Sequence, residues 1–398
     1  MKPLSAAVPV TIGFCENGAG YGGAVISLAA MLAHLPAAYR ACLYTSLGTS
    51  QYQQLASLAT WRHVPPLTLV RPERIRSSGV PFASSIDNVL NLLPSSVRYY
   101  RHFKRDKVEL VYLNNDAICN MAAARGARLA GLPMVLHARG FNSATRGSRW
   151  VLANLEHCIA VSHAVRDELL ALGLAPEKCT VVPEGLDLAQ FCPRPPAAGL
   201  RAALGIDAHD PVITLVGGLV DWKGQDVVLD AAPAILARFP NAHILLVGSA
   251  YGKDDGFAEQ LARRAAQPAL DGRVRLLGAR DDVADLLSIS DIVLHASTKP
   301  EPFGRTFLEG MALGKAVIAS NEGGPLDVIE HEVDGLLIAP RQPEVLAAAV
   351  TRLLSQPAFA ARLAENAALK ARAYSIQSHT EQVSAVLHQV LGRTRVRG

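Results

Sequence analysis

Short apolar runs alternate along the whole chain with longer segments of helical periodicity. Apolar runs bounded by turn residues are typical of buried parallel strands, and the 3.6-residue period between them indicates helices. The alternation predicts an α/β protein built from two series of parallel strands. The first series comprises residues 8–15, 108–113, 133–137, 158–161 and 179–183, with a helix expected at 24–35, and the second comprises residues 211–216, 244–247, 274–277, 292–295 and 316–319.

The length of the chain and one proline-rich segment suggest where the two series separate. A chain of 398 residues is longer than one hydrophobic core usually covers, so two domains with a cleft between them are expected. Residues 192–199 contain three prolines and can continue neither a helix nor a central strand. We therefore predict an N-terminal domain at residues 1–195 and a C-terminal domain at residues 196–374, with a helix at residues 375–391 packing back on the first domain.

Composition excludes several classes of protein. No apolar run reaches the roughly 18 to 20 residues that span a bilayer, and no cleaved signal is expected, so we predict a cytoplasmic protein. The net charge of +4 is too small to indicate nucleic-acid binding. The six cysteines are scattered without a C-x-x-C pair and suggest neither a zinc site nor a disulfide framework.

Two glutamates follow the apolar run at residues 292–295. Gly304 lies in a sharp turn, and a helix is expected to open near Gly304 or Arg305, which leaves backbone N–H groups free at the end of the strand. Glu301 lies in the turn and Glu309 lies roughly a turn and a half into the helix, so both could reach one ligand. The alternative is that both are solvated surface acids, because most helix glutamates are exposed.

The pattern around these glutamates resembles a known enzyme family. Seven residues separate the two glutamates, Phe-Gly stands between them, and Gly-x-Pro follows shortly after, as in the retaining glycosyltransferases of family four. That family has the GT-B fold, in which two Rossmann-like parallel-sheet domains face a central cleft. The resemblance implies that Glu301 binds the transferred sugar near its reacting face and that Glu309 holds the nucleotide ribose. It also implies donor contacts from the backbone N–H groups of Phe303, Gly304 and Arg305.

A second cluster follows the first strand of the C-terminal series. Lys223 stands just before an expected helix, where a lysine and the helix dipole can hold a diphosphate without a metal. The alternative is an exposed loop lysine. The family usually has Gly-Arg where this chain has Gly217-Gly218, so one positive charge of the donor site is missing at Gly218. We hypothesise that Arg305 or Arg139 supplies that charge.

Two features of the N-terminal domain complete the candidate site. A glycine-rich turn at residues 18–23 lets the backbone approach a ligand, although such turns also use glycine for steric reasons alone. The family resemblance implies that Gly22 and Gly23 lie beside the donor phosphates. His137 ends a strand, and the resemblance places it near the donor sugar as a catalytic residue, while the alternative is a structural histidine.

A basic and aromatic segment lies at residues 88–107. It holds five Lys or Arg residues against one acid, interleaved with two tyrosines and a phenylalanine. Such a segment predicts peripheral contact with an anionic membrane, at the inner face of the plasma membrane. The alternative is a solvated helix face.

These observations predict a retaining hexosyltransferase that moves a sugar from a nucleoside diphosphate sugar to an acceptor hydroxyl. The acceptor would be a glycan or a lipid-linked glycan in polysaccharide, lipopolysaccharide or glycolipid assembly. We expect no metal and no other cofactor, because Lys223 and helix N-termini would stabilise the leaving diphosphate. Glu301 is the one obvious carboxylate for a double displacement, yet the family resemblance favours front-face attack by the acceptor. A sugar-nucleotide epimerase of the same architecture and a nonenzymatic sugar-binding subunit stay open as alternatives.

Overall fold

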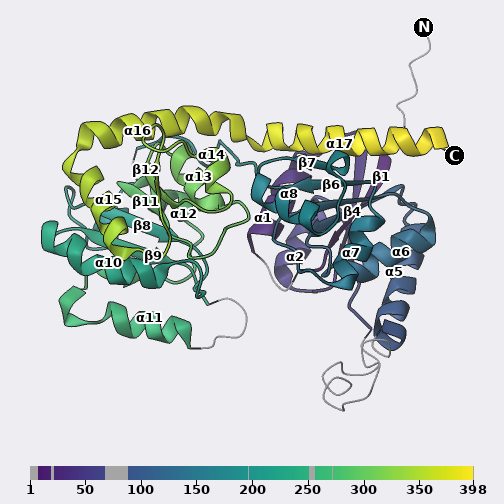
Figure 1. Cartoon of the computed structure of the whole chain (residues 1–398), viewed down its shortest axis with the longest axis horizontal. Coiled ribbons are helices and arrows are strands. Elements are labelled where there is room, and N and C mark those ends of the chain that lie inside the picture. Colours follow the sequence, from purple (N-terminus) through teal and green to yellow (C-terminus); the bar gives the residue numbers. More distant parts are fainter. Residues whose placement is uncertain are drawn as a thin grey trace, which may run out of the picture. The chain divides into compact units, whose positions relative to one another are not determined.

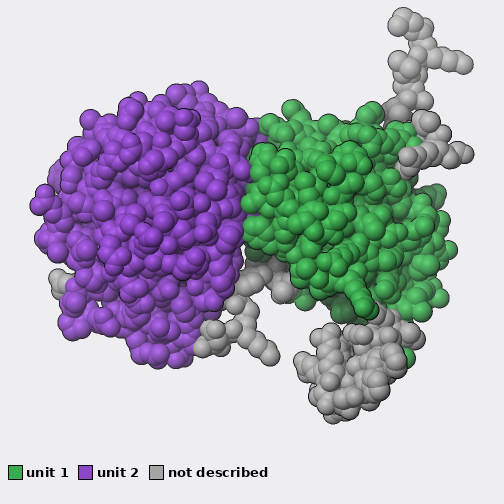
Figure 2. Space-filling view, viewed as in Figure 1, with its two compact units in different colours: residues 1–185, 376–398 green, residues 186–375 purple. Residues whose placement is uncertain are grey.

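The chain forms two compact units (Figure 2). The computed structural model describes residues 8–18, 22–67, 88–195, 197–250, 256–270 and 272–397. Unit 1 comprises Met1–Gly185 and Ile376–Gly398, and unit 2 comprises Leu186–Ser375. Residues 186–195, which the sequence placed in the N-terminal domain, thus belong with the second unit, and the boundary precedes the proline-rich segment. Within unit 2, the Leu186 amide donates to the Tyr374 carbonyl at 2.9 Å. This hydrogen bond joins the beginning of the unit to its end.

Unit 1 is built on a parallel sheet whose order, in the described residues, is β3-β2-β1-β4-β5-β6-β7. The central strands are almost fully buried, which explains why they are continuous apolar runs in the sequence. The predicted strands of the first series are confirmed, whereas β2 and β3 were not predicted because β2 opens on polar residues and β3 is a half-exposed edge strand. The strands are β1 Val10–Glu16, β2 Tyr39–Thr45, β3 Thr60–His63, β4 Leu110–Asn115, β5 Met134–Ala138, β6 His157–Ala160 and β7 Cys179–Val181.

Helices cover both faces of this sheet. In β2, Leu43 joins the core formed with α1 and α17, while the ring of the next residue, Tyr44, lies 5.1 Å from that of Phe103 in α5. The helices of the unit are α1 Gly23–Ala33, α2 Ser50–Gln54, α5 Leu93–Arg105, α6 Met121–Ala130, α7 Arg146–Ala153, α8 His163–Ala171 and α17 Ile376–Arg397, with short helical turns at Leu55–Ser57, Asn88–Leu92 and Pro176–Lys178 (Figure 1).

Unit 2 repeats the same architecture. The described residues form a parallel sheet of order β10-β9-β8-β11-β12-β13. Successive strands are added on one side of β8 up to β10 and on its other side from β11 onward, so the strand order reverses between β8 and β11. Ligands of open α/β sheets bind at such a reversal, beyond the carboxyl ends of the strands. The predicted strands of the second series are confirmed. The strands are β8 Val212–Val216, β9 His243–Val247, β10 Val274–Leu276, β11 Ile292–His295, β12 Ala316–Ser320 and β13 Leu336–Ile338.

The helices of unit 2 also lie on both faces of its sheet. Ile213 and Leu215 of β8 pack with α10 and α15, whereas Val212 packs with Leu286 of α12 on the other face. The helices are α9 Leu200–Ala203, α10 Gln225–Arg238, α11 Phe257–Ala265, α12 Val283–Ser288, α13 Arg305–Ala312, α14 Pro325–Val328, α15 Pro343–Ser355 and α16 Pro357–Ala371, with short helical turns at Pro268–Leu270 and Arg372–Tyr374 (Figure 1).

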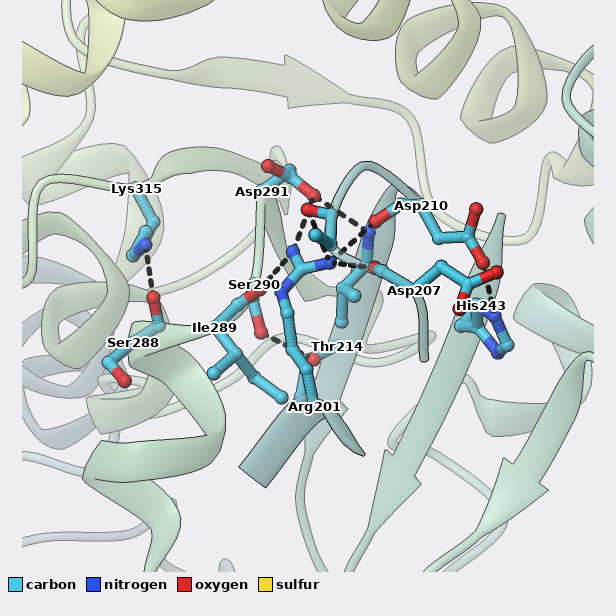
Figure 3. Close-up of polar contacts among 12 residues, drawn as sticks. Arg201, Asp207, Asp210, Thr214, His243, Ser288, Ile289, Ser290, Asp291 and Lys315 are labelled. Atoms are coloured by element: carbon cyan, nitrogen blue, oxygen red, sulfur yellow. Dashed lines mark hydrogen bonds and ion pairs between the residues drawn. The ribbon is translucent and has the colours of Figure 1, made fainter. Parts of the chain in front are cut away.

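The amino-terminal edge of the unit 2 sheet carries a polar network around Arg201 (Figure 3). The guanidinium group donates to the carbonyls of Asp207, Asp210 and Ile289 and lies 3.6 Å from the Asp291 carboxylate. A cavity of about 510 Å³ opens beside this network. The network lies at the amino ends of the strands, opposite to the carboxyl ends where ligands of such sheets bind, so we assign it a structural role.

The C-terminal helix α17 supplies a testable contribution to the stability of unit 1. Leu387 is fully buried in the core shared with α1 and the sheet. We expect Leu387→Ala to lower the free energy of unfolding by about 2 to 5 kcal/mol, because it removes buried methyl groups and leaves a cavity. Urea unfolding measures the change, and Gln389→Ala at an exposed position of the same helix is the control. Equal stability of the two variants would contradict the packing of α17 in this core.

Candidate donor site

The turn that carries Glu301 is built by tight backbone packing in unit 2. Helix α13 begins at Arg305, as predicted, and the preceding Gly304 has a φ of +93°, which favours glycine. On the other side, a Cβ at Gly323 would lie 2.2 Å from the Glu301 carbonyl oxygen, and the amide of Gly324 donates to that oxygen at 2.8 Å. The loop at residues 321–324 therefore fixes the backbone of Glu301.

Both glutamates of the motif are buried. Glu301 is 7% exposed and Glu309 is 8% exposed, which excludes the alternative that they are solvated surface acids. A buried carboxylate requires compensation by charge or hydrogen bonds. The two carboxylates obtain it in different ways.

Glu301 is held as an ionised group by three side chains. The Lys223 Nζ donates to both carboxylate oxygens at 2.7 Å, and the Ser297 hydroxyl donates to Oε2 at 2.9 Å. The Nε2 atom of His295 lies 3.4 Å from Oε2. Burial alone would raise the pKa of Glu301, but the Lys223 charge and the His295 contact outweigh burial and hold the pKa well below its usual range.

Among the described residues, Glu309 has one counter-charge, and it lies in the same helix. The Arg305 Nη2 lies 3.6 Å from Glu309 Oε1, one turn away in α13. Burial raises the pKa of Glu309, and Arg305 only partly opposes that effect. Arg305, one candidate for the missing second cation, therefore lies beside Glu309. Phe303, in the turn before the helix, is buried against Phe307 with ring centroids 5.8 Å apart.

A close contact between two loops brings Lys223 to Glu301. Gly224 precedes helix α10 with a φ of +78°, and a Cβ there would lie 1.9 Å from the carbonyl oxygen of Ala296, the residue after β11. Only glycine permits this approach, which joins the loops after β8 and β11 at the point where the strand order of the sheet reverses. Lys223 also lies 4.3 Å from the centroid of the Trp222 ring.

Gly218 stands where the family usually has an arginine, and the structure gives its backbone a hydrogen-bond partner. The Gly218 carbonyl accepts a hydrogen bond from Gln225 Nε2 at 2.9 Å. A Cβ at Gly248 would lie 2.0 Å from the Gly217 carbonyl oxygen, so this segment packs tightly against the loop after β9. Gly218 can contribute backbone atoms to a ligand but no positive charge.

In unit 1, His137 is completely buried at the end of β5. Its Nδ1 atom contacts the Tyr112 hydroxyl, and its ring stacks on that of His379 of α17 with centroids 5.5 Å apart. Burial, followed by the charges of Arg139 and His379, lowers the pKa of His137 well below its usual value. The ring is therefore neutral near pH 7, and its catalytic role stays a prediction.

Arg139, the other candidate for the second cation, has a carboxylate partner inside unit 1. Its Nη1 lies 2.6 Å from both oxygens of Glu184, and its Nε donates to Asn114 Oδ1 at 2.7 Å. Asn114 also donates to the buried carboxylate of Glu16, which accepts from the Gly18 amide at 2.8 Å. The charge of Arg139 is thus balanced within its own unit.

The glycine-rich turn of unit 1 is described only in part. Residues 19–21 lie outside the described residues, whereas Gly22 is the N-cap of α1 and Gly23 is its first residue. The Val25 and Ile26 amides donate to the Gly22 carbonyl. Gly22 and Gly23 therefore stand at a helix N-terminus, where backbone N–H groups are free to meet an anion.

Several residues at these two edges were not singled out by any sequence pattern. Ser297 and His295 contact the Glu301 carboxylate, and Glu16 and Asn114 belong to the Arg139 network. Their common signal is a polar residue at or just beyond the carboxyl end of a buried strand. Such a residue is too frequent in sequences to indicate a site without the contacts.

The described part of the chain holds no group of three or more His, Cys, Asp or Glu side chains arranged to bind a metal ion. None of its helices is long and apolar enough to cross a bilayer.

Comparisons with known proteins place both units in one family. Residues 198–370 match the model of the glycosyl transferases group 1, and residues 21–190 match that of Glycosyltransferase Family 4. The D-inositol 3-phosphate glycosyltransferase of Rhodococcus opacus is 33% identical over 234 residues, which are 58% of this chain and 52% of that protein. The match thus spans about half the length of this relative.

Solved structures share the architecture. HepE of Anabaena, crystallised with UDP-glucose, has a TM-score of 0.80 and 24% identity, covering 95% of this chain and 99% of that chain. Sucrose-phosphate synthase of Thermosynechococcus elongatus has a TM-score of 0.74 and 21% identity, covering 96% of this chain and 100% of that chain. Two Rossmann-like parallel-sheet units of this kind define the GT-B class. Within that class, the chain belongs to the family 4 glycosyltransferases.

The Lys223–Glu301 pair predicts a measurable coupling in the stability of the protein. Lys223→Met leaves a buried carboxylate without its cation and should lower the free energy of unfolding by about 1 to 3 kcal/mol. Adding Glu301→Gln removes the uncompensated charge, so the double variant should regain part of that loss. Urea unfolding of the two single variants and the double variant measures the coupling, and additive changes would contradict it.

The same pair fixes the sign of a pH dependence. The pKa of Glu301 is lower in the folded than in the unfolded protein, so its stabilising contribution is complete above the usual glutamate pKa of about 4.3. The contribution is lost as the pH falls from there toward the folded pKa. The wild type should lose more stability than Glu301→Gln between about pH 6 and about pH 3.

Proposed function

We propose that this protein is a retaining glycosyltransferase that transfers a sugar from a nucleoside diphosphate sugar to an acceptor hydroxyl. The observation that carries the proposal is the buried, ionised Glu301, which Lys223 holds at the point where the strand order of the unit 2 sheet reverses. Ligands of α/β sheets gather at that point, and the pair offers both a cation for phosphate and a carboxylate for sugar hydroxyls. The crystallised complexes of HepE with UDP and UDP-glucose make uridine diphosphate sugars the first donors to test.

In this proposal the residues of unit 2 divide the donor among them. Lys223 leaves Glu301 to hold the diphosphate, and the free N–H groups at the start of α13, near Phe303 to Arg305, add a second positive end. Glu301 then faces the transferred sugar and Glu309 the ribose. Gly218 contributes backbone atoms. The roles of Gly22, Gly23 and His137 are those that the family resemblance implies.

The chemistry follows from these placements. The diphosphate departs with its charge stabilised by Lys223 and by a helix N-terminus, which act in place of a metal ion. The acceptor hydroxyl attacks the face from which the diphosphate leaves and gives its proton to the departing diphosphate oxygen, so the anomeric configuration is retained. Glu301 stabilises the positive charge that develops on the sugar ring. Arg139 and Arg305 each lie beside a carboxylate, as Lys223 does, and both stay candidates for the second cation.

The donor test combines binding with turnover. Uridine, guanosine and adenosine diphosphate sugars are added to purified protein, and the matching nucleotide should raise the melting temperature, since ligand at about 100 Kd stabilises the folded state by about 2.7 kcal/mol. Release of nucleoside diphosphate is then measured with and without EDTA. We expect Glu301→Gln to lower turnover by about 100-fold or more while nucleotide binding persists.

The exposed Glu259 of α11 gives the matched control, because Glu259→Gln makes the same change away from the site. Loss of turnover in EDTA would contradict the metal-independent mechanism. Isomerisation of the donor in the absence of acceptor would indicate an epimerase. Binding of the sugar nucleotide without any turnover would indicate a sugar-binding subunit.

We further propose that the protein acts in the cytoplasm on glycan or lipid-linked acceptors of polysaccharide, lipopolysaccharide or glycolipid assembly, at the inner face of the plasma membrane. Helix α5 within residues 88–107 supports this placement. Its Arg101 and Lys104 are exposed, whereas Tyr99 and Phe103 are buried in unit 1. The contact with anionic lipid would thus be electrostatic, without insertion of these two aromatic side chains.

Flotation with vesicles tests the membrane contact. Each Lys or Arg near an anionic surface is worth about 1 kcal/mol, so replacing Arg101 and Lys104 by Glu should weaken binding to phosphatidylglycerol vesicles by at least about tenfold. Replacing Arg238 and Arg263 by Glu, at exposed positions of α10 and α11 in unit 2, is the charge-matched control. Binding that is unaffected by the α5 substitutions or by salt would contradict the proposal.

A further inference from the structure

His295, the last residue of β11, is a buried polar group that packing alone does not explain. Its side chain is 3% exposed, and neither ring nitrogen has a hydrogen-bond partner among the described residues. A buried donor or acceptor without a partner costs about 1 to 3 kcal/mol, a cost that an apolar residue of similar size would avoid. The histidine therefore offers hydrogen-bonding capacity that no described residue uses.

The surroundings of His295 fix the direction of its ring. A Cβ on Gly304 would lie 2.7 Å from Nε2, so the turn before α13 rests directly on this nitrogen. The Phe307 ring meets the imidazole edge-on, with centroids 5.6 Å apart and an interplanar angle of 87°. Held between these groups, Nε2 stays on the side of the Glu301 carboxylate, 3.4 Å from Oε2.

The contacts of the two oxygens of Glu301 are unequal. Oε2 is approached by three groups, the Lys223 ammonium, the Ser297 hydroxyl and the His295 ring, whereas Oε1 is contacted by Lys223 alone among the described side chains. When Lys223 turns to a diphosphate, as the proposed function requires, Oε1 is released and Oε2 is not. A buried carboxylate that loses its cation needs stronger hydrogen bonds from its remaining donors.

We propose that His295 is a positioning residue of the donor site, which holds Oε2 of Glu301 through Nε2–H when Lys223 engages the diphosphate. The small gap between Nε2 and Oε2 closes, Ser297 keeps its hydrogen bond, and Oε1 alone faces the transferred sugar. The inference rests on the proposed function. It adds a reason why a histidine, rather than an aliphatic residue, ends this buried strand.

Two substitutions separate a hydrogen-bonding role from a packing role. His295→Gln keeps an N–H donor near the position of Nε2, whereas His295→Leu keeps bulk without a donor. With a sugar nucleotide that the wild type uses, we expect His295→Leu to lower kcat by about 10- to 100-fold with the donor KM within about threefold, because Glu301 acts on the reacting sugar. His295→Gln should restore kcat to within about fivefold of the wild type.

His209→Leu is the control, since this exposed histidine lies at the opposite edge of the sheet. Melting temperatures establish that all variants are folded. An unchanged kcat in His295→Leu would overturn the proposal. So would a His295→Gln variant that is folded but no more active than His295→Leu.

A second measurement does not depend on turnover and so separates this inference from the proposed function. Nitrogen-15 NMR of the imidazole ring reports the hydrogen bonding of Nε2, with assignment by loss of the signal in His295→Gln. We expect the Nε2 signal to shift when UDP is added to the wild type, and to shift in the same direction in Lys223→Met without UDP. Absence of a shift in Lys223→Met would overturn the positioning role even if the enzyme transfers sugar, whereas a shift without any turnover would support it and count against the proposed function.

Discussion

The ion pair between Lys223 and Glu301 is the interaction on which the candidate site depends. Both groups are largely removed from water, and each would be costly there without the other. Their attraction keeps the carboxylate ionised, as its lowered pKa indicates. A pair of this kind adds little net stability over apolar packing, and its position beyond the carboxyl ends of the strands supports the proposed role in donor binding.

Glycine contacts between loops make that pair possible. Gly224 lies against the carbonyl of Ala296, and Gly323 lies against the backbone of Glu301, at distances that no other residue could adopt without a shift. These contacts bring together loops that follow different strands and are far apart in the sequence. The site is therefore preorganised by backbone packing, and its two charges meet because the backbone leaves them little other freedom.

Unit 1 shows the same principle. Arg139 and Glu184 form a buried pair at the carboxyl edge of its sheet, and Asn114 connects the pair to Glu16. Here the cation is paired within its own unit, as Lys223 is in unit 2. Arg139 and Arg305 stay the predicted substitutes for the family arginine that is absent at Gly218, and Lys223 with the α13 N-terminus is the positive end of the proposed donor site.

The sequence by itself determined the parallel α/β architecture and most of the strands, and it singled out Glu301, Glu309 and Lys223 as candidates for the site, because apolar periodicity and glycine-flanked motifs are local signals. It did not determine the partners of these residues. The burial of Glu309, the pairing of Arg139 with Glu184 and the pairing of Lys223 with Glu301 depend on segments that are distant along the chain. Such contacts depend on strand order and on close loop packing, which only the tertiary structure decides.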